Sequence, residues 1–204
     1  MTNNFRLMNK NLRTLTVMAV LSALAVVLSY LEIPLPFFAF WIKLDFANVP
    51  ALMAAFAFGP LAGVGVLAIT NIFHAILRGA TNGIGELANF IMGAALILPA
   101  GLIYKRDYNL RHTRLGAWVG SGAGTVVSVV TALVTNVYVL IPLYSRLFHI
   151  DIDQIGFLFG TGGMTGYLLA ASLPFNLLKS LLTCGVMLVA YKPLSPILHG
   201  RSRR

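Results

Sequence analysis

Apolar residues gather into long runs along this chain, and short polar stretches separate the runs. A helix needs about 20 apolar residues to cross the hydrocarbon core of a bilayer. Four runs approach or exceed this length, at residues 13–31, 84–104, 115–142 and 173–192. A further apolar stretch at 47–78 is interrupted by Gly59-Pro60. Because proline breaks the helical hydrogen-bond ladder and disfavours helix in the residue before it, we expect two helices there, joined by a tight turn.

The positions of the basic residues predict how these helices cross the membrane. Lysine and arginine form three clusters: one before the first run, one between 84–104 and 115–142, and one at the end of the chain. Because cytoplasmic loops carry an excess of Lys and Arg, all three clusters should be cytoplasmic. Four crossings must then separate the first two clusters, which makes Gly59-Pro60 a cytoplasmic turn, and two more crossings precede the last. The glycine-rich stretch 155–172 therefore does not cross fully, and we expect an outer loop or a re-entrant segment there.

The predicted fold is an all-α integral membrane protein with six transmembrane helices and both termini cytoplasmic, and residues 1–204 form a single transmembrane domain. The helices are expected at residues 13–31, 47–58, 61–78, 84–104, 115–142 and 173–192. The outer loops are expected at residues 32–46, 79–83 and 143–172. The second helix is too short to cross alone, so we expect it to extend from Leu44 or to start in a recess that is shielded from lipid.

Composition supports this fold class. Of the 204 residues, 58% are hydrophobic and 10% are charged, whereas a soluble domain carries about 25% charged residues. The net charge of +9 would otherwise suggest nucleic acid as a partner, but its clustering between apolar runs argues against nucleic acid. Cys184 is the only cysteine and lies in an apolar run, which excludes an intrachain disulfide and a cysteine-built metal site.

The last predicted helix carries a polar stripe. Ser172, Asn176, Lys179 and Thr183 recur at spacings of four, three and four, which places them on one helical face. A lysine near a helix end can extend its charge to the membrane interface. Asn176 shares the face and has no long chain with which to do so. A polar cavity beside this face explains both residues.

Three further polar residues are candidates for the same cavity. Asn136 is a large amide near the outer end of the preceding helix, where it could meet Asn176 and Lys179. Glu86 and Asn89 share a face at the start of the fourth helix. Because polar groups inside a membrane are costly, each is a functional hypothesis; Glu86 could also lie at the water interface or interact with the helix N-terminus.

The sequence leaves other classes of function open. An intramembrane enzyme could use Glu86, His74 and Lys179, and a gradient-driven carrier could use Lys179 or Glu86 as its proton site. Asn71 and His74 could equally be packing or hydrogen-bonding residues. No G-x-x-x-x-G-K-[ST], H-E-x-x-H or G-x-S-x-G motif is present. The chain therefore does not hydrolyse ATP itself, and energised transport would require a partner or a gradient.

Two features point to contacts outside the helical bundle. Ala19 and Ala23 lie four residues apart on the first helix, a small-xxx-small pattern that allows another helix to approach closely. The first outer loop is rich in prolines and aromatic residues: Pro34, Pro36, Phe37, Phe38, Phe40 and Trp41. These side chains could form an aromatic belt at the interface or a stiff lid over a flat ligand.

Taken together, these residues resemble the riboflavin-binding S components of energy-coupling factor (ECF) vitamin transporters. The matching stretches run in order from the first helix to the last and cover about three-quarters of the chain. They are Ile33-Pro34-Leu35-Pro36-Phe37, Leu44-Asp45-Phe46-Ala47-Asn48-Val49-Pro50-Ala51-Leu52, Phe58-Gly59-Pro60-Leu61-Ala62-Gly63, Gly85-Glu86-Leu87-Ala88-Asn89-Phe90, Asn136 with Pro142-Leu143-Tyr144, and Pro174-Phe175-Asn176-Leu177-Leu178-Lys179. One departure is Thr70, where members of the family often carry lysine.

The resemblance implies a vitamin site that opens outward between the first loop and the outer helix ends. The residues that match the family's isoalloxazine-binding groups are Asn136, Asn176 and Lys179. The ribityl hydroxyls would contact Lys43, Leu44 and Asp45, and we also assign Glu86 and Asn89 to the substrate site. Another vitamin or flavin mononucleotide remains an alternative substrate.

The resemblance also implies partners and a location. Such a subunit lies in a prokaryotic plasma membrane, captures its vitamin from outside and has no enzymatic activity. It would deliver the vitamin inward together with a transmembrane coupling protein and two cytoplasmic ATPases. Ala19 and Ala23 would provide its docking surface for the coupling protein.

Overall fold

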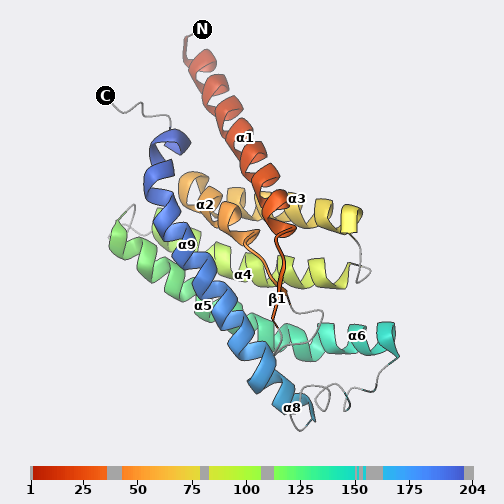
Figure 1. Cartoon of the computed structure of the whole chain (residues 1–204). Helices are drawn as coiled ribbons and strands as arrows, with labels where there is room; N and C mark the ends of the chain where they lie inside the picture. Colours follow the sequence, from red (N-terminus) through yellow and green to blue (C-terminus); the bar gives the residue numbers. More distant parts are fainter. Residues whose placement is uncertain are drawn as a thin grey trace.

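The computed structural model describes residues 2–35, 43–78, 83–106, 113–149, 151, 154 and 163–199. Over these residues the chain forms six helical segments, as predicted (Figure 1). Four are uninterrupted helices: α1 (Thr2–Ser29), α2 (Asn48–Phe58), α3 (Pro60–Arg78) and α4 (Ile84–Arg106). The fifth joins α5 (Arg114–Thr135), a π-helix η1 (Asn136–Leu140) and α6 (Ile141–Phe148). The sixth joins α8 (Gly163–Tyr167), a π-helix η2 (Leu168–Ser172) and α9 (Leu173–His199).

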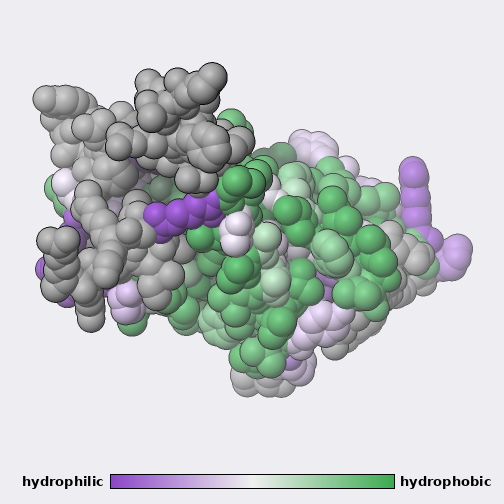
Figure 2. Space-filling model, turned by 90° about the horizontal axis from the view of Figure 1, so that it is seen from above, coloured by the Kyte–Doolittle hydropathy of each residue, from purple (hydrophilic) through white to green (hydrophobic). Residues whose placement is uncertain are grey.

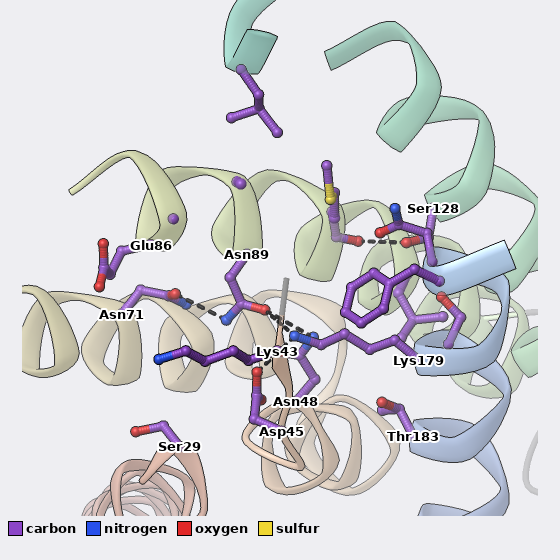
Figure 3. A pocket seen from close by; sticks show the side chains of 18 of the residues that line it. Ser29, Lys43, Asp45, Asn48, Asn71, Glu86, Asn89, Ser128, Lys179 and Thr183 are labelled. Atoms are coloured by element: carbon purple, nitrogen blue, oxygen red, sulfur yellow. Dashed lines mark hydrogen bonds and ion pairs between the residues drawn. The ribbon is translucent and has the colours of Figure 1, made fainter. Parts of the chain in front are cut away.

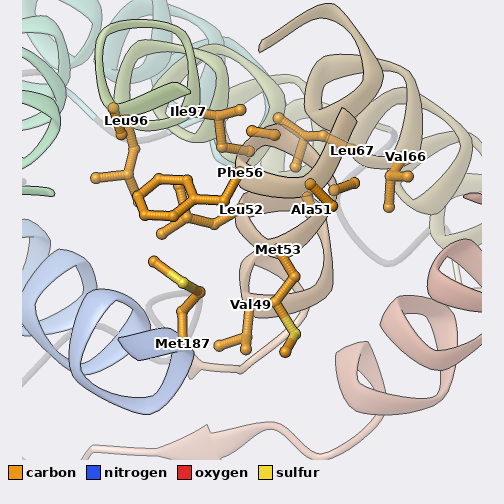
Figure 4. Close-up of a cluster of buried hydrophobic side chains, with 14 of the residues drawn as sticks. Val49, Ala51, Leu52, Met53, Phe56, Val66, Leu67, Leu96, Ile97 and Met187 are labelled. Atoms are coloured by element: carbon orange, nitrogen blue, oxygen red, sulfur yellow. The ribbon is translucent and has the colours of Figure 1, made fainter. Parts of the chain in front are cut away.

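Helix α2 is the short second helix, for which the sequence left open an extension from Leu44 or a start in a shielded recess. It has 11 residues, ten of which are buried, and it contacts α1, α3, α4 and α9. Figure 4 shows Leu52 and Phe56 of α2 beside Leu96 of α4 and Met187 of α9. A helix too short to cross a bilayer alone is thus shielded from lipid by its neighbours, and it starts at Asn48 without extending from Leu44.

The predicted loop at 143–172 is partly wrong. Residues 143–148 belong to α6, and residues 163–172 form α8 and η2, which continue directly into α9. Pro142 and Pro174 each lie at the second residue of a helix that follows a π-helical segment. A π-helical turn changes the spacing of the backbone hydrogen bonds. The N–H groups of a first helical turn have no acceptor within the helix, so a proline there removes no hydrogen bond. Residues 155–162 lie outside the described residues.

The predicted turn between α2 and α3 is present at Gly59. Its φ of 115° and ψ of 165° define a conformation that is essentially restricted to glycine. The Lys105 ammonium of α4 donates to Ala57 O at 3.2 Å and so satisfies a carbonyl at the end of α2.

Helices α4 and α5 approach closely because α5 has glycines at the contact. A Cβ atom at Gly120 would lie 2.8 Å from Ala100 O, and one at Gly124 would lie 2.4 Å from Leu96 O. The small residues of α5 therefore mediate helix packing, as small residues commonly do in membranes.

The outer surface of the bundle is strongly apolar. Five helical segments are long and apolar enough to cross a membrane, and large apolar side chains such as Leu61, Trp118, Val126 and Val189 are exposed. Figure 2 shows hydrophobic residues spread over much of one face. The start of α1 and the end of α9 lie on the same side of the molecule (Figure 1). That this side is cytoplasmic remains a prediction.

Candidate ligand-binding site

A cavity of about 350 Å³ lies between the helices and below the first loop. This volume is within the range of about 300–1,000 Å³ that is usual for small-molecule sites. Its polar wall contains seven of the eight residues that we assigned to the substrate site: Lys43, Asp45, Glu86, Asn89, Asn136, Asn176 and Lys179. The eighth, Leu44, is buried on strand β2 (Lys43–Leu44) and does not line the cavity.

Lys179 joins the first loop to the last helix. Its Nζ lies 2.7 Å from Asp45 Oδ2 and donates to Asn89 Oδ1 at 3.0 Å (Figure 3). Both charged side chains are largely buried, with exposed fractions of 14% for Lys179 and 15% for Asp45. Asp45 Oδ1 accepts from the backbone N–H of Ala47 at 2.9 Å, just before α2 begins. Lys179 therefore faces the cavity, as the helical stripe predicted, and it also neutralises a buried carboxylate.

The backbone around Asp45 is held by a short antiparallel ribbon. Strand β1 (Ile33–Pro34) pairs with β2, with Ile33 opposite Leu44 and Pro34 opposite Lys43. The ribbon brings Lys43 and Asp45 over the cavity. The aromatic lid residues Phe37, Phe38, Phe40 and Trp41 lie outside the described residues.

Asn136 and Asn176 meet through Ser172. The Nδ2 of Asn136 donates to Ser172 Oγ at 3.0 Å and to Ala132 O at 2.8 Å. The Nδ2 of Asn176 donates to Ser172 O at 2.8 Å and approaches Ser172 Oγ at 3.5 Å. Because the amide nitrogens are engaged, each Oδ1 remains available as an acceptor. The two π-helical segments contribute Asn136 and Ser172, and π-helical turns are frequent at functional sites.

Glu86 belongs to a charged cluster that the sequence did not predict. Its Oε1 lies 2.8 Å from His74 Nδ1, and His74 Nε2 lies 3.4 Å from Glu32 Oε1. Lys43 Nζ lies 2.7 Å from Glu32 Oε2. Glu86 is only 9% exposed, so its carboxylate is not a solvent-facing group at the membrane interface. Residues 32, 74 and 86 are far apart in sequence, and no spacing rule connects them.

A chain of three amides, of which Asn48 and Asn71 are buried, crosses the cavity wall. Asn48 Nδ2 approaches Asn89 Oδ1 at 3.5 Å, and Asn89 Nδ2 donates to Asn71 Oδ1 at 3.0 Å. Asn71 Nδ2 in turn donates to Leu67 O at 2.8 Å. Asn48 was not among the predicted site residues, although an amide at the start of an apolar helix is a signal that could have identified it.

The remaining wall of the cavity is apolar and aromatic. It includes Met92, Leu96, Leu140, Tyr144, Tyr167 and Phe175. Among the described residues, no group of three or more His, Cys, Asp or Glu side chains could hold a metal ion. The site can therefore bind an organic molecule with a flat apolar part and several hydrogen-bonding groups.

A multi-pass helical bundle with a polar cavity under its first loop defines a ligand-binding membrane protein. The family described as "ECF transporter, substrate-specific component" matches residues 13–191, and the chain belongs to this family. It is accordingly a multi-pass protein of the cell membrane.

Curated relatives are similar over almost their full length. The chain is 32% identical to "Riboflavin transporter RibU" of Staphylococcus aureus (strain TCH60), over 94% of each chain. It is 30% identical to "Riboflavin transporter FmnP" of Bacillus subtilis (strain 168), over 90% of this chain and 93% of that one. These relatives are named as transporters, and the chain is a transport component and not an enzyme.

A solved structure shares the fold. It is described as the S component of a bacterial ECF transporter, and it matches with a TM-score of 0.73 and 30% sequence identity. The match covers 93% of this chain and 98% of that chain. The predicted all-α membrane fold is therefore confirmed, whereas the cytoplasmic location of the termini stays a prediction.

Proposed function

We propose that this chain binds riboflavin in the cavity and serves as the substrate-binding subunit of an ECF vitamin transporter. The observation that carries the proposal is that Asn136, Asn176 and Lys179 line the same cavity. The edge of the isoalloxazine ring presents an N–H group between two carbonyl oxygens. The free Oδ1 atoms of the two asparagines are suitable acceptors for the N–H, and the Lys179 ammonium is a suitable donor for a carbonyl oxygen. The names of the two relatives support the same ligand.

The apolar wall supports the same ligand. A flat tricyclic ring presents two apolar faces, and the cavity offers the side chains of Leu96, Leu140 and Phe175 for contact with them. Burial of aromatic surface contributes most of the binding free energy of such ligands. Asp45 is held by Lys179 above this space, so the first loop would cover a ligand that enters from outside.

The simplest test is ligand selection. The purified protein is incubated with an equimolar mixture of riboflavin, flavin mononucleotide and other water-soluble vitamins, then separated from free ligand and denatured. Riboflavin should be recovered in preference to every other compound in the mixture. Recovery of a different vitamin would contradict the proposed ligand while leaving the family unchanged.

A gradient-driven carrier is the alternative mechanism, because Lys179 and Glu86 are buried ionisable groups. Proteoliposomes that contain only this chain distinguish the two mechanisms. A subunit that depends on ATPases should bind riboflavin but accumulate none, even with an imposed proton gradient. Accumulation without ATPase subunits would favour the carrier.

Partners are the second part of the proposal. We infer that the chain docks on a transmembrane coupling protein, which two ATPases drive, and that Ala19 and Ala23 form the contact. Both alanines are exposed on α1, so another helix could approach closely there.

Enlarging this surface should uncouple transport from binding. We expect the double substitution Ala19→Leu, Ala23→Leu to reduce riboflavin uptake by cells about tenfold or more while binding by the purified subunit stays unchanged. Val20 is 62% exposed on the same helix, so Val20→Leu serves as the matched control and should retain uptake. Normal uptake by the double variant would contradict the docking assignment.

A further inference from the structure

His74 lies between two carboxylates that come from different parts of the fold. Its Nδ1 lies 2.8 Å from Glu86 Oε1 on α4, and its Nε2 lies 3.4 Å from Glu32 Oε1 in the segment after α1. All three side chains are largely buried, with exposed fractions of 17% for His74, 16% for Glu32 and 10% for Glu86. Because each ring nitrogen faces a carboxylate, the charge of this histidine determines how strongly the two segments are held together.

A neutral imidazole ring cannot donate to both carboxylates. It has one N–H group and one acceptor nitrogen, whereas the imidazolium has two N–H groups. In the neutral state one carboxylate therefore faces a ring nitrogen that has no proton. Protonation gives this carboxylate a charged donor, and such an attraction is stronger where the groups are shielded from water. Histidine is the side chain whose charge ordinarily changes between about pH 5 and 8.

A proton on His74 also balances the charges around it. The described residues that face the ring are Glu86 of α4, together with Glu32 and Tyr30 beyond the end of α1, while α2 has no titratable side chain. Lys43 Nζ lies 2.7 Å from Glu32 Oε2 and is 39% exposed. With His74 protonated, two carboxylates meet two cations; with His74 neutral, they meet one. The other titratable residues of the cavity wall are Asp45, Tyr144, Tyr167 and Lys179.

These contacts join the first loop to the helical bundle. Glu32 precedes β1 and Lys43 lies on β2, so their ion pair connects the two arms of the ribbon. His74 lies on α3 and Glu86 on α4, and these two helices pack together. Figure 3 shows Lys43 extending from beside Asp45 toward the end of the cavity at which Glu86 lies. The contact between His74 and Glu32 is therefore the one that links the ribbon to the bundle at this end.

A second ion pair holds the same loop without a histidine. Lys179 Nζ on α9 lies 2.7 Å from Asp45 Oδ2, just beyond β2. The loop thus has two attachments of different chemistry, one to α9 through this pair and one to α3 through His74. Only the attachment through His74 contains a side chain that ordinarily titrates near neutral pH.

We propose that a proton on His74 fastens the first loop over the cavity and slows the exchange of ligand. The effect on the ligand rests on the proposed binding of riboflavin, whereas the fastening of the loop is a property of the protein alone. Below about pH 6 the imidazolium attracts both Glu32 and Glu86. As the pH rises toward about 8 the proton is lost, the contact with Glu32 weakens, and the loop opens more often.

The first measurement follows the loop without any ligand. Hydrogen exchange of the peptides that contain β1 and β2 is measured by mass spectrometry at about pH 6 and pH 8, for the purified wild type and His74→Gln. Glutamine is uncharged at both values and can still donate to one carboxylate. Comparison at equal pH cancels the intrinsic pH dependence of exchange. We expect the wild type to exchange about fivefold or more slowly than the variant at the lower pH, and within about twofold of it at the higher pH.

The second measurement follows the release of riboflavin. The bound protein is diluted, and the dissociation rate is read from the recovery of flavin fluorescence at the same two pH values. The wild type should release riboflavin about fivefold or more slowly at the lower pH, whereas His74→Gln should release it at similar rates at both. Glu32→Gln removes the carboxylate on the loop side of the contact and should lose the pH dependence in the same way.

His149→Asn is the matched control. His149 is exposed at the end of α6 and does not line the cavity. Its φ of 53° lies in the left-handed region, which asparagine tolerates better than most residues. This variant should keep the wild-type pH dependence in both measurements, so that the effect belongs to His74 and not to the loss of any histidine.

The two measurements separate this inference from the proposed function. Equal exchange of the wild type, His74→Gln and Glu32→Gln at the lower pH would overturn the inference, as would a pH-dependent release that persists in both variants. Release from the wild type at one rate at both pH values would also overturn it. Slower loop exchange in the wild type, together with no binding of riboflavin at either pH, would support the fastened loop and contradict the proposed ligand.

Discussion

Replacing Lys179 with methionine is expected to weaken riboflavin binding by about 100-fold or more. The substitution removes a charged donor from the cavity, and hydrogen bonds to charged groups contribute about 1.5–3 kcal/mol. It also leaves the Asp45 carboxylate, 15% exposed, without its cation at 2.7 Å. Breaking a buried ion pair on one side costs about 3–5 kcal/mol. Titration of riboflavin fluorescence with the purified variant measures the loss.

Two further variants separate the two causes. Asp45→Asn combined with Lys179→Met removes the uncompensated charge, so the double variant should recover thermal stability without recovering affinity. Lys192→Met removes an exposed lysine from the same helix and should bind riboflavin as the wild type does. A Lys179→Met protein whose affinity stays within threefold of wild type would exclude Lys179 from the site.

Gly124→Ala is expected to cause the largest loss of stability among glycine substitutions in α5. The new Cβ atom would lie 2.4 Å from Leu96 O and 3.2 Å from Ala100 Cβ. Because the first contact is with backbone of α4, relief requires the two helices to separate. Overpacking of this kind costs about 1–3 kcal/mol and occasionally more. Thermal unfolding in detergent should show a clearly lower midpoint.

Gly122→Ala is the matched control in the same helix. A Cβ atom at Gly122 has nothing within 4 Å, and alanine favours helix over glycine by about 1 kcal/mol. This variant should unfold at the wild-type temperature or above it. If both variants unfold at the same temperature, the close approach of α4 and α5 is not a source of stability.

The number of helices and most of the cavity could be predicted from the sequence because both depend on the cost of polar groups in lipid. Long apolar runs in lipid form helices, because the backbone polar groups must be hydrogen-bonded within the segment. Asn176 and Lys179 lie at helical spacing on one face, and polar side chains in lipid require a polar cavity beside that face.

The remaining features depend on contacts that sequence spacing does not encode. His74 was grouped with Glu86 only as a possible enzyme site, and its contact with Glu32 was not predicted, because the three residues come from separate elements. The helices predicted to end at residue 142 and to begin at residue 173 are both longer, because π-helical segments join them to α6 and α8. Asn48 could have been recognised as a costly buried amide, but its unpartnered oxygen became evident only from the packing around it.

The most direct measurement is an equilibrium titration of riboflavin with the purified wild-type protein, followed by the quenching of flavin fluorescence. Saturation at one riboflavin per chain, with a dissociation constant below the micromolar range, is the expected result. Absence of quenching at micromolar protein and ligand would contradict riboflavin as the ligand of this cavity.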